Sequence, residues 1–152
     1  MIVFRLTKTE YAYDLTGKGA EQSGGRWNHK GVPVIYTCES RALCVTEVAV
    51  HIPLHIVPRD YSMVEIEIPD KVKSFDIDPD KLEKIWKAFP YRPYTKEILH
   101  QHLISQKHLI YKVPSAVVQG SWNYLINPRH KDIGLIKIKT VEDFGFDQRL
   151  FT

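Results

Sequence analysis

The sequence lacks the features of a membrane protein and of a small disulfide-stabilised protein. It has only two cysteines, Cys38 and Cys44, in 152 residues. Two reduced, buried thiols are the state expected in a cytoplasmic protein, and a disulfide between them is the alternative. No stretch approaches the roughly 18 consecutive apolar residues of a membrane span. The N-terminal run is charged by its fifth residue and has no long apolar core, which is not the pattern of a signal peptide.

The charge balance is also nearly even. The 21 Lys and Arg residues against 18 Asp and Glu give a formal net charge of +3, too small an excess to indicate binding of nucleic acid by this chain. Hydrophobic residues make up 43% and charged residues 26%, which excludes a disordered, collagenous or coiled-coil chain. A chain of this length can bury roughly 68–70% of its unfolded surface. Without repeats or linkers, the sequence predicts one soluble cytoplasmic domain spanning residues 1–152.

Metal and nucleotide motifs are missing as well. The sequence contains no CxxC, HExxH, GxGxxG or GxxxxGK[ST] pattern. His51 and His55 are four apart, but Pro53 interrupts the helix that would align them. His100 and His102 are two apart on a predicted helix, so their side chains diverge. We therefore predict no metal site and no resident cofactor.

The pattern of apolar residues predicts an α+β domain with a mixed, mostly antiparallel sheet and flanking helices. Thr7–Gly25 holds four of the eight glycines and is predicted to be a long irregular loop near a ligand site. The predicted strands are Ile2–Leu6, Val32–Cys38, Tyr61–Ile68, one or two in His108–Val118 broken at Pro114, and Ile133–Ile138. The predicted helices are Ala42–His51, capped by Ser40 and apolar almost all round, then Asp80–Phe89 and Thr95–Ser105.

Glu47 is the anomalous residue of the predicted helix, because its carboxylate shares the helix with apolar side chains. A carboxylate is rarely buried without a partner, since removing its charge from water is costly. It either faces a solvent gap or a structural arginine, or it lies at the floor of a cleft. Arg26 is the natural counterpart, because a guanidinium can form a bidentate pair with a phosphate or with Glu47.

Four further residues are candidates beside this pair. Gly24 and Gly25 precede Arg26 and would let the backbone turn and approach a ligand closely. Tyr36 lies within a predicted strand. It either has a functional role or is a core residue whose hydroxyl is hydrogen-bonded inside the protein. Ser115 is a small polar residue on an apolar strand, where simple packing is the alternative.

Taken in order, six motifs resemble the RES domain family, which is named for its arginine, glutamate and serine. The resemblance covers the chain from about Phe4 to Leu150. The motifs are GGRWN (24–28), PVIYTCES (33–40), ALCVTEVAVH (42–51), VPSAVV (113–118), NYLINPRH (123–130) and FDQRL (146–150).

The resemblance implies a fold similar to ADP-ribosyltransferases and a toxin that degrades NAD⁺ as its substrate, by hydrolysis or phosphorolysis. At least one family member transfers ADP-ribose to a protein instead. The family's arginine, tyrosine, glutamate and serine fall on Arg26, Tyr36, Glu47 and Ser115. Gly24, Gly25, Trp27, Asn123 and His130 are implied as further substrate-binding residues.

The resemblance also implies partners and leaves some questions open. RES toxins pair with an Xre-like helix-turn-helix antitoxin, which would supply the DNA contacts, and relatives commonly form homodimers. A catalytically silent antitoxin-binding module is the third alternative, after NAD⁺ cleavage and protein modification. Other members often carry a charged or polar run, commonly with a glutamate, where this chain has Gln119–Trp122. Ser121, within this segment, is a rival for the role of the family's serine. Water, phosphate or protein all remain possible acceptors, with Lys30 a candidate for recruiting phosphate.

Overall fold

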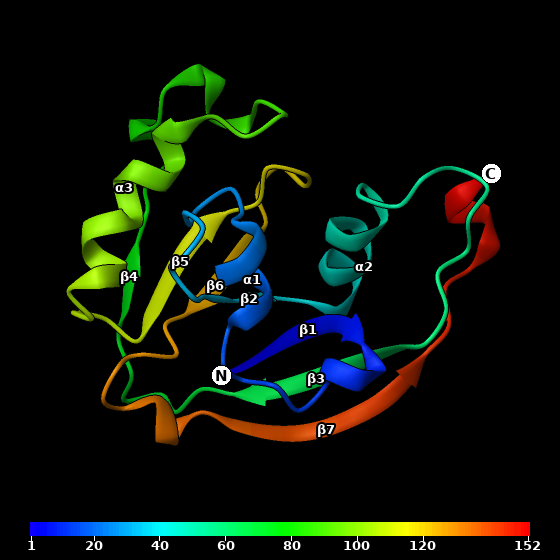
Figure 1. The fold of residues 1–152 in the computed structure, drawn as a ribbon, viewed down its shortest axis with the longest axis horizontal. Helices are drawn as coiled ribbons and strands as arrows, with labels where there is room; N and C mark the ends of the chain where they lie inside the picture. Colours follow the sequence, from blue (N-terminus) through cyan, green and yellow to red (C-terminus); the bar gives the residue numbers. More distant parts are fainter.

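The computed structural model describes residues 1–152 and has the predicted α+β architecture (Figure 1). No helix in it is long and apolar enough to cross a bilayer. Its seven strands are β1 (Ile2–Lys8), β2 (Ile35–Cys38), β3 (Tyr61–Glu67), β4 (Ser74–Asp76), β5 (Ile110–Pro114), β6 (Trp122–Ile126) and β7 (Lys137–Phe144). Its α-helices are α1 (Lys18–Ser23), α2 (Arg41–Ala49) and α3 (Pro93–Ile104).

One sheet contains all seven strands in the order β4-β5-β6-β2-β1-β3-β7, and only β4 and β5 run parallel. β1 pairs with β3 along its whole length, from Ile2 opposite Glu67 to Lys8 opposite Tyr61. By contrast, β1 meets β2 at a single position, Phe4 opposite Cys38. The sheet therefore consists of two halves that diverge beyond this one pair, and the space between them is available for a site.

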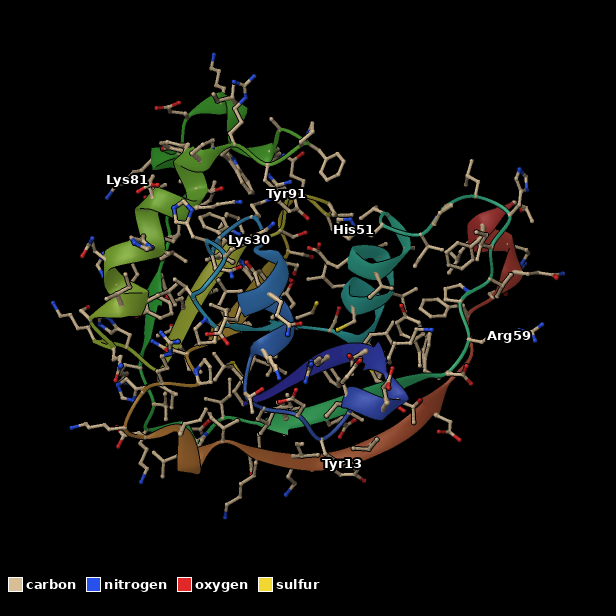
Figure 2. The ribbon with its side chains drawn as sticks, in the orientation of Figure 1. Tyr13, Lys30, His51, Arg59, Lys81 and Tyr91 are labelled. Carbon is tan, nitrogen blue, oxygen red and sulfur yellow. The ribbon has the colours of Figure 1, made fainter.

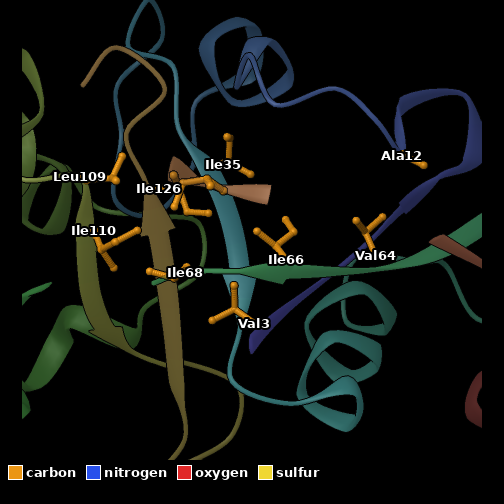
Figure 3. Close-up of a cluster of buried hydrophobic side chains, with 10 residues drawn as sticks. Val3, Ala12, Ile35, Val64, Ile66, Ile68, Leu109, Ile110 and Ile126 are labelled. Atoms are coloured by element: carbon orange, nitrogen blue, oxygen red, sulfur yellow. The ribbon is translucent and has the colours of Figure 1, made fainter. Parts of the chain in front are cut away.

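Three apolar clusters hold these halves in place. The first packs β-branched residues of β1, β2, β3, β5 and β6, and it includes Val3, Ile35, Ile66 and Ile126 (Figure 3). The second lies beneath α3 and joins that helix to the half of the sheet that contains β5 and β6. The third packs Leu43 and Cys44 of α2 against β1 and β3. The first cluster thus joins both halves of the sheet, because it contains residues of β1 and β3 from one half and of β2, β5 and β6 from the other, whereas the second lies within one half.

Helix α2 begins where the sequence predicts it to begin. The Ser40 hydroxyl oxygen accepts a hydrogen bond from the Leu43 backbone N–H at 3.1 Å and so caps the helix. The expectation that the helix is packed inside on nearly all sides is wrong. Only Leu43 and Cys44 are buried, and Val50 at its C-terminal end is 56% exposed. Val48 packs against the third cluster and also borders a cavity, so part of the helix faces open space.

Two predicted elements in the first two-thirds of the chain are wrong. Thr7–Gly25 is not an irregular loop throughout, because β1 continues to Lys8 and α1 follows a positive-φ Gly17. Asp80–Phe89 does not form a helix but contains 3₁₀ turns at Pro79–Lys81 and Lys84–Lys87. The N–H groups of Trp86 and Ala88 bond to carbonyls three residues back, those of Glu83 and Ile85, and the carbonyls of Trp86 and Ala88 accept hydrogen bonds from a distant arginine.

The end of the sheet also differs from the prediction. Ile133–Leu135 forms a 3₁₀ turn, and the last strand, β7, starts only at Lys137. This strand lies at the sheet edge and carries charged residues on its exposed side, which obscures its apolar alternation. β4 and β6 were not predicted as separate strands, since β4 has only three residues and β6 begins within a polar stretch.

We predict that Ser40→Ala lowers the free energy of unfolding by about 1 kcal/mol, because the Leu43 N–H loses its acceptor. Urea denaturation followed by far-UV circular dichroism measures the change. Ser105→Ala is the matched control, since its exposed hydroxyl donates to the His102 carbonyl and caps no N–H group. The control should change stability by less than about 0.5 kcal/mol; equal losses in both variants would contradict the capping role.

Candidate active site

A cavity of about 770 Å³ opens where β1 and β2 diverge. Its walls come from β1, β2 and the outward face of α2, and from the loops on either side of them. The wall residues that carry chemistry or hydrogen-bonding groups include Arg5, Gly24, Gly25, Arg26, Trp27, Tyr36, Glu47, His51, Lys87, Tyr91 and Asn123. Seven of these eleven are residues that the sequence predicts for the site, and they come from four separate segments.

Glu47 lies on the outward face of α2, in the cavity wall. Its Oε1 atom accepts two short hydrogen bonds, one from the Ser115 hydroxyl and one from the Asn123 side-chain amide, each 2.7 Å long. Its Oε2 atom has no hydrogen-bond partner in the protein. Both neutral donors hold the same oxygen, so the carboxylate has a defined orientation and one oxygen left to accept from a ligand. Of the alternatives for Glu47, the cleft is the correct one, and no arginine pairs with it.

Ser115 reaches the cavity only through Glu47. Its side chain is 2% exposed, and it does not contribute to the cavity wall. Besides donating to Glu47, its hydroxyl oxygen accepts from the backbone N–H groups of Val117 and Val118 at 3.1 and 2.9 Å. Ser121 contributes only backbone hydrogen bonds, accepting one from the Ser115 N–H at its carbonyl. Of the two serines, Ser115 is therefore the one whose hydroxyl contacts Glu47.

Asn123 stands beside Glu47 at the start of β6, opposite Cys38 of β2. Its Nδ2 atom is committed to Glu47, whereas its Oδ1 atom is buried and has no hydrogen-bond partner. A buried acceptor without a partner is costly, and such groups are rare in folded proteins. Asn123 therefore holds the carboxylate through its amide nitrogen and leaves a buried oxygen without a partner beside it.

The loop 24–28 is shaped by Tyr36. The Tyr36 hydroxyl accepts from the Trp27 backbone N–H at 3.1 Å and donates to Asn28 Oδ1 at 2.8 Å. Gly24 has φ +69°, and a Cβ atom at Gly25 would lie 2.7 Å from the Tyr36 hydroxyl oxygen. The glycine pair thus permits a tight turn and close packing on Tyr36, and both glycines border the cavity. Burial raises the pKa of Tyr36, so its hydroxyl stays protonated and remains a donor.

Arg26 extends from this loop across the cavity. Its Nη1 atom donates to the carbonyl oxygens of Trp86 and Ala88 at 2.7 and 3.1 Å, and its guanidinium stacks over the Tyr91 ring at 4.9 Å. It forms no ion pair, and its Nε and Nη2 atoms have no hydrogen-bond partner. Burial lowers the pKa of Arg26, and the nearby Tyr91 and Glu47 act in the opposite direction by raising it. Arg26 and Glu47 therefore share one cavity, and the arginine also fastens the segment 84–91.

Two residues at the cavity mouth were missed by sequence reasoning. The Tyr91 hydroxyl lies 3.4 Å from His51 Nε2, which brings the segment after Lys87 against the end of α2 (Figure 2). Phe89, which is 73% exposed, lies between them with its ring centroid 6.2 Å from that of His51 and 5.4 Å from that of Tyr91. The only signal in the sequence was the aromatic pair of Phe89, at the end of the predicted helix, and Tyr91, just beyond it.

The cavity floor contains both cysteines, which are free thiols. Cys44 lies one turn before Glu47 on α2, and Cys38 ends β2. A hydrogen bond with Cys44, together with burial, raises the pKa of the Cys38 thiol. It therefore remains protonated and contributes an apolar surface rather than a nucleophile.

Two candidates fall outside the cavity. His130 lies in the turn that follows β6, where its Nδ1 atom accepts from the Asp132 N–H at 3.1 Å. The cavity reaches only the opposite end of that strand, at Asn123. Lys30 is exposed and likewise does not contribute to the wall. No three His, Cys, Asp or Glu side chains converge in an arrangement that could hold a metal ion.

Comparison with known proteins gives a family match over almost the whole chain. The family model described as RES domain matches residues 2–147. The Prs ADP-ribosylating toxin of a Sphingobium species is 38% identical over 94% of this chain and 90% of its own length. Toxin Res of Pseudomonas putida is 37% identical over 99% of this chain and 100% of its own length.

A solved structure extends the comparison to the fold. The MbcT–MbcA toxin–antitoxin complex of Mycobacterium tuberculosis contains a chain that aligns with a TM-score of 0.76. The alignment covers 99% of this chain and 86% of that one at 21% sequence identity, which shows a shared fold.

We predict that Tyr36→Phe lowers the free energy of unfolding by about 1–3 kcal/mol, because the Trp27 N–H then lacks an acceptor in a buried loop. Thermal and urea unfolding measure the loss. Tyr13→Phe is the matched control, since Tyr13 is 75% exposed and its hydroxyl makes no hydrogen bond. Unchanged stability in Tyr36→Phe would show that the hydroxyl does not support the loop.

Proposed function

This chain belongs to the RES domain family, and on that premise we propose that it is the toxin of a toxin–antitoxin module that cleaves the nicotinamide–ribose bond of NAD⁺. One observation carries the proposal. A carboxylate oriented by two neutral donors, Glu47, shares a cavity with an unpaired guanidinium, Arg26. The volume of about 770 Å³ lies within the range of roughly 300–1,000 Å³ typical of ligand pockets.

The chemistry requires stabilisation of positive charge on the ribose. Nicotinamide leaves as a neutral group from a cationic ring, so it needs no strong general acid. The ribose meanwhile develops oxocarbenium character, as in glycoside hydrolysis. The free Oε2 of Glu47 would accept from a ribose hydroxyl, and this interaction strengthens as the positive charge grows. Ser115 and Asn123 hold the carboxylate in that position before the substrate arrives.

The charges of the cavity complement those of the substrate. NAD⁺ has a positive nicotinamide ring at one end and a diphosphate with two negative charges near its centre. Glu47 suits the first, and the free Nε and Nη2 atoms of Arg26 suit the second through a bidentate contact. Tyr36 contributes by fixing the Arg26 loop, while its ring borders the cavity. Anchoring the diphosphate would keep the reacting ribose still.

The acceptor of the ADP-ribosyl group distinguishes the candidate activities. Water gives hydrolysis and inorganic phosphate gives phosphorolysis. Transfer to a protein is the second candidate, favoured by the 38% identity to a toxin named for ADP-ribosylation. With labelled NAD⁺ and a cell extract, label recovered as free ADP-ribose or its phosphate supports the first candidate. Label recovered on a protein supports the second. A silent binding module would release neither product.

We further propose a partner and a location from the family. The partner is a cognate antitoxin of the Xre-like helix-turn-helix class, and the toxin acts in the cytoplasm. The neighbouring structure is a toxin–antitoxin complex, which supports an antitoxin partner. Co-expression with the adjacent reading frame should prevent the loss of cellular NAD⁺ that the chain alone causes, and size-exclusion chromatography with light scattering would test for a homodimer.

We predict that Glu47→Gln reduces NAD⁺ consumption by about 100-fold or more, because the amide keeps the shape of the carboxylate but cannot stabilise a cation. Turnover of NAD⁺ by purified protein measures the effect, with circular dichroism as the check on folding. Glu10→Gln is the control, because Glu10 is exposed and makes no hydrogen bond. Full turnover by Glu47→Gln would remove Glu47 from the mechanism.

We predict that Arg26→Lys raises KM for NAD⁺ by about tenfold with a smaller effect on kcat. A single ammonium cannot hold two carbonyl groups and also grip a diphosphate bidentately. Steady-state kinetics separate the two parameters. Arg59→Lys is the control, because Arg59 is exposed and lies far from the cavity (Figure 2). An unchanged KM would contradict the anchoring role.

A further inference from the structure

One large aromatic side chain at the cavity mouth is left outside the core. Of the six phenylalanines, Phe89 alone is exposed, and its exposed fraction is 73%. The other exposed aromatic residues are Tyr11 and Tyr13, and neither contributes to the cavity wall, whereas Phe89 does. The Phe89 ring therefore gains little from burial in the protein itself, and its apolar surface remains accessible to a ligand in the cavity.

The Phe89 ring has two aromatic neighbours but no parallel stacking partner. Its centroid lies 5.4 Å from that of Tyr91, with the two ring planes at 81°, and 6.2 Å from that of His51, with the planes at 55°. The Tyr91 hydroxyl and His51 Nε2 lie 3.4 Å apart, so the two neighbours also contact each other. These tilted and edge contacts hold the ring without covering it face to face. The face of an aromatic ring is the surface on which a nucleotide base stacks.

Phe89 also lies close to the residue proposed to anchor the diphosphate. The guanidinium of Arg26 stacks over the Tyr91 ring at 4.9 Å, and the same Tyr91 ring contacts Phe89. A single side chain therefore separates the proposed diphosphate site from the free ring. In NAD⁺ each of the two bases is joined to the diphosphate through one ribose. A base of a dinucleotide held at Arg26 can thus reach Phe89.

The position of Glu47 indicates which base this is. If Glu47 holds the nicotinamide ribose at the cavity floor, the adenine half extends from Arg26 towards the mouth. We propose that Phe89 is the adenine-binding residue of the cavity, with its ring stacked on the purine. The proposal rests on the proposed function for the identity of the ligand. Stacking would stabilise the bound adenine without any hydrogen bond to its edge.

Binding of fragments to wild type and Phe89 variants tests this inference without any chemical step. ADP carries adenine and a diphosphate, inorganic pyrophosphate lacks the base, and reduced nicotinamide mononucleotide carries the other base as an uncharged ring that is a poor leaving group. Phe89→Leu removes the ring and keeps an apolar side chain, whereas Phe89→Tyr keeps the ring. Tyr13→Leu is the matched control, because Tyr13 is an exposed aromatic residue outside the cavity wall. Isothermal titration calorimetry gives the affinities, and circular dichroism checks folding.

We predict that Phe89→Leu weakens ADP binding about tenfold and leaves pyrophosphate binding unchanged, because only ADP has a base to stack. Phe89→Tyr and Tyr13→Leu should bind ADP as the wild type does. Unchanged ADP affinity in Phe89→Leu would overturn the inference, as would an equal loss in Phe89→Tyr.

Three further results would also overturn it. An equal loss for pyrophosphate would mean that Phe89 acts only through Tyr91 on Arg26. A loss confined to the nicotinamide nucleotide would mean that the stacked ring is nicotinamide. A wild-type protein that binds none of the probes would leave no base for Phe89 to hold.

The two proposals fail in different ways. If Phe89→Leu loses ADP affinity but the wild type consumes no NAD⁺, the proposed function fails and the adenine site stands. If the wild type consumes NAD⁺ and Phe89→Leu keeps the wild-type KM and ADP affinity, the adenine site fails and the proposed function stands. A raised KM for NAD⁺ with unchanged kcat in Phe89→Leu, together with the ADP loss, supports both, because adenine is remote from the bond that breaks.

Discussion

The single pairing of Phe4 with Cys38 is the constraint on which the site depends. Beyond it, the main-chain groups of β1 and β2 lose their ladder partners, and strands with free edges ordinarily attract another chain. The protein instead joins the two halves through a shared apolar cluster and lays α2 against β1 through Leu43 and Cys44. The separation is therefore stable, and the cavity it opens is built into the fold.

The charged groups of the cavity are oriented by neutral partners. Two donors, Ser115 and Asn123, hold Glu47, and backbone carbonyl groups hold Arg26 and Arg5. A salt bridge between Glu47 and Arg26 would have satisfied both charges but cancelled them. Neutral hydrogen bonds fix the geometry and leave the charge available to a ligand. Keeping these charges partly buried lowers the free energy of unfolding. A bound dinucleotide would offset this loss.

Local patterns in the sequence correctly predicted the structural features that depend on residues close together in the chain. The Ser40 cap, the alternation in β3 and the α+β class follow from spacing within a few residues, and all are present. The predicted Asp80–Phe89 helix is wrong, because the segment forms short 3₁₀ turns and is fastened by Arg26, a residue some sixty positions away that the local pattern does not reveal. Arg5 was missed for a related reason. An arginine on a strand is distinctive only once the adjacent strand is known to diverge from it.

The arrangement of the site separates the bond that breaks from the group that receives the sugar. Glu47 and its donors lie at the floor, beside the buried cysteines, whereas Phe89, Tyr91 and His51 border the mouth. On the proposed chemistry, the ribose cation forms at the floor in the same way whichever acceptor follows. The acceptor must then arrive through the space that nicotinamide leaves, past the aromatic residues at the mouth. Selection among water, phosphate and protein therefore depends on the mouth, so relatives can share Glu47 and Arg26 and still differ in product.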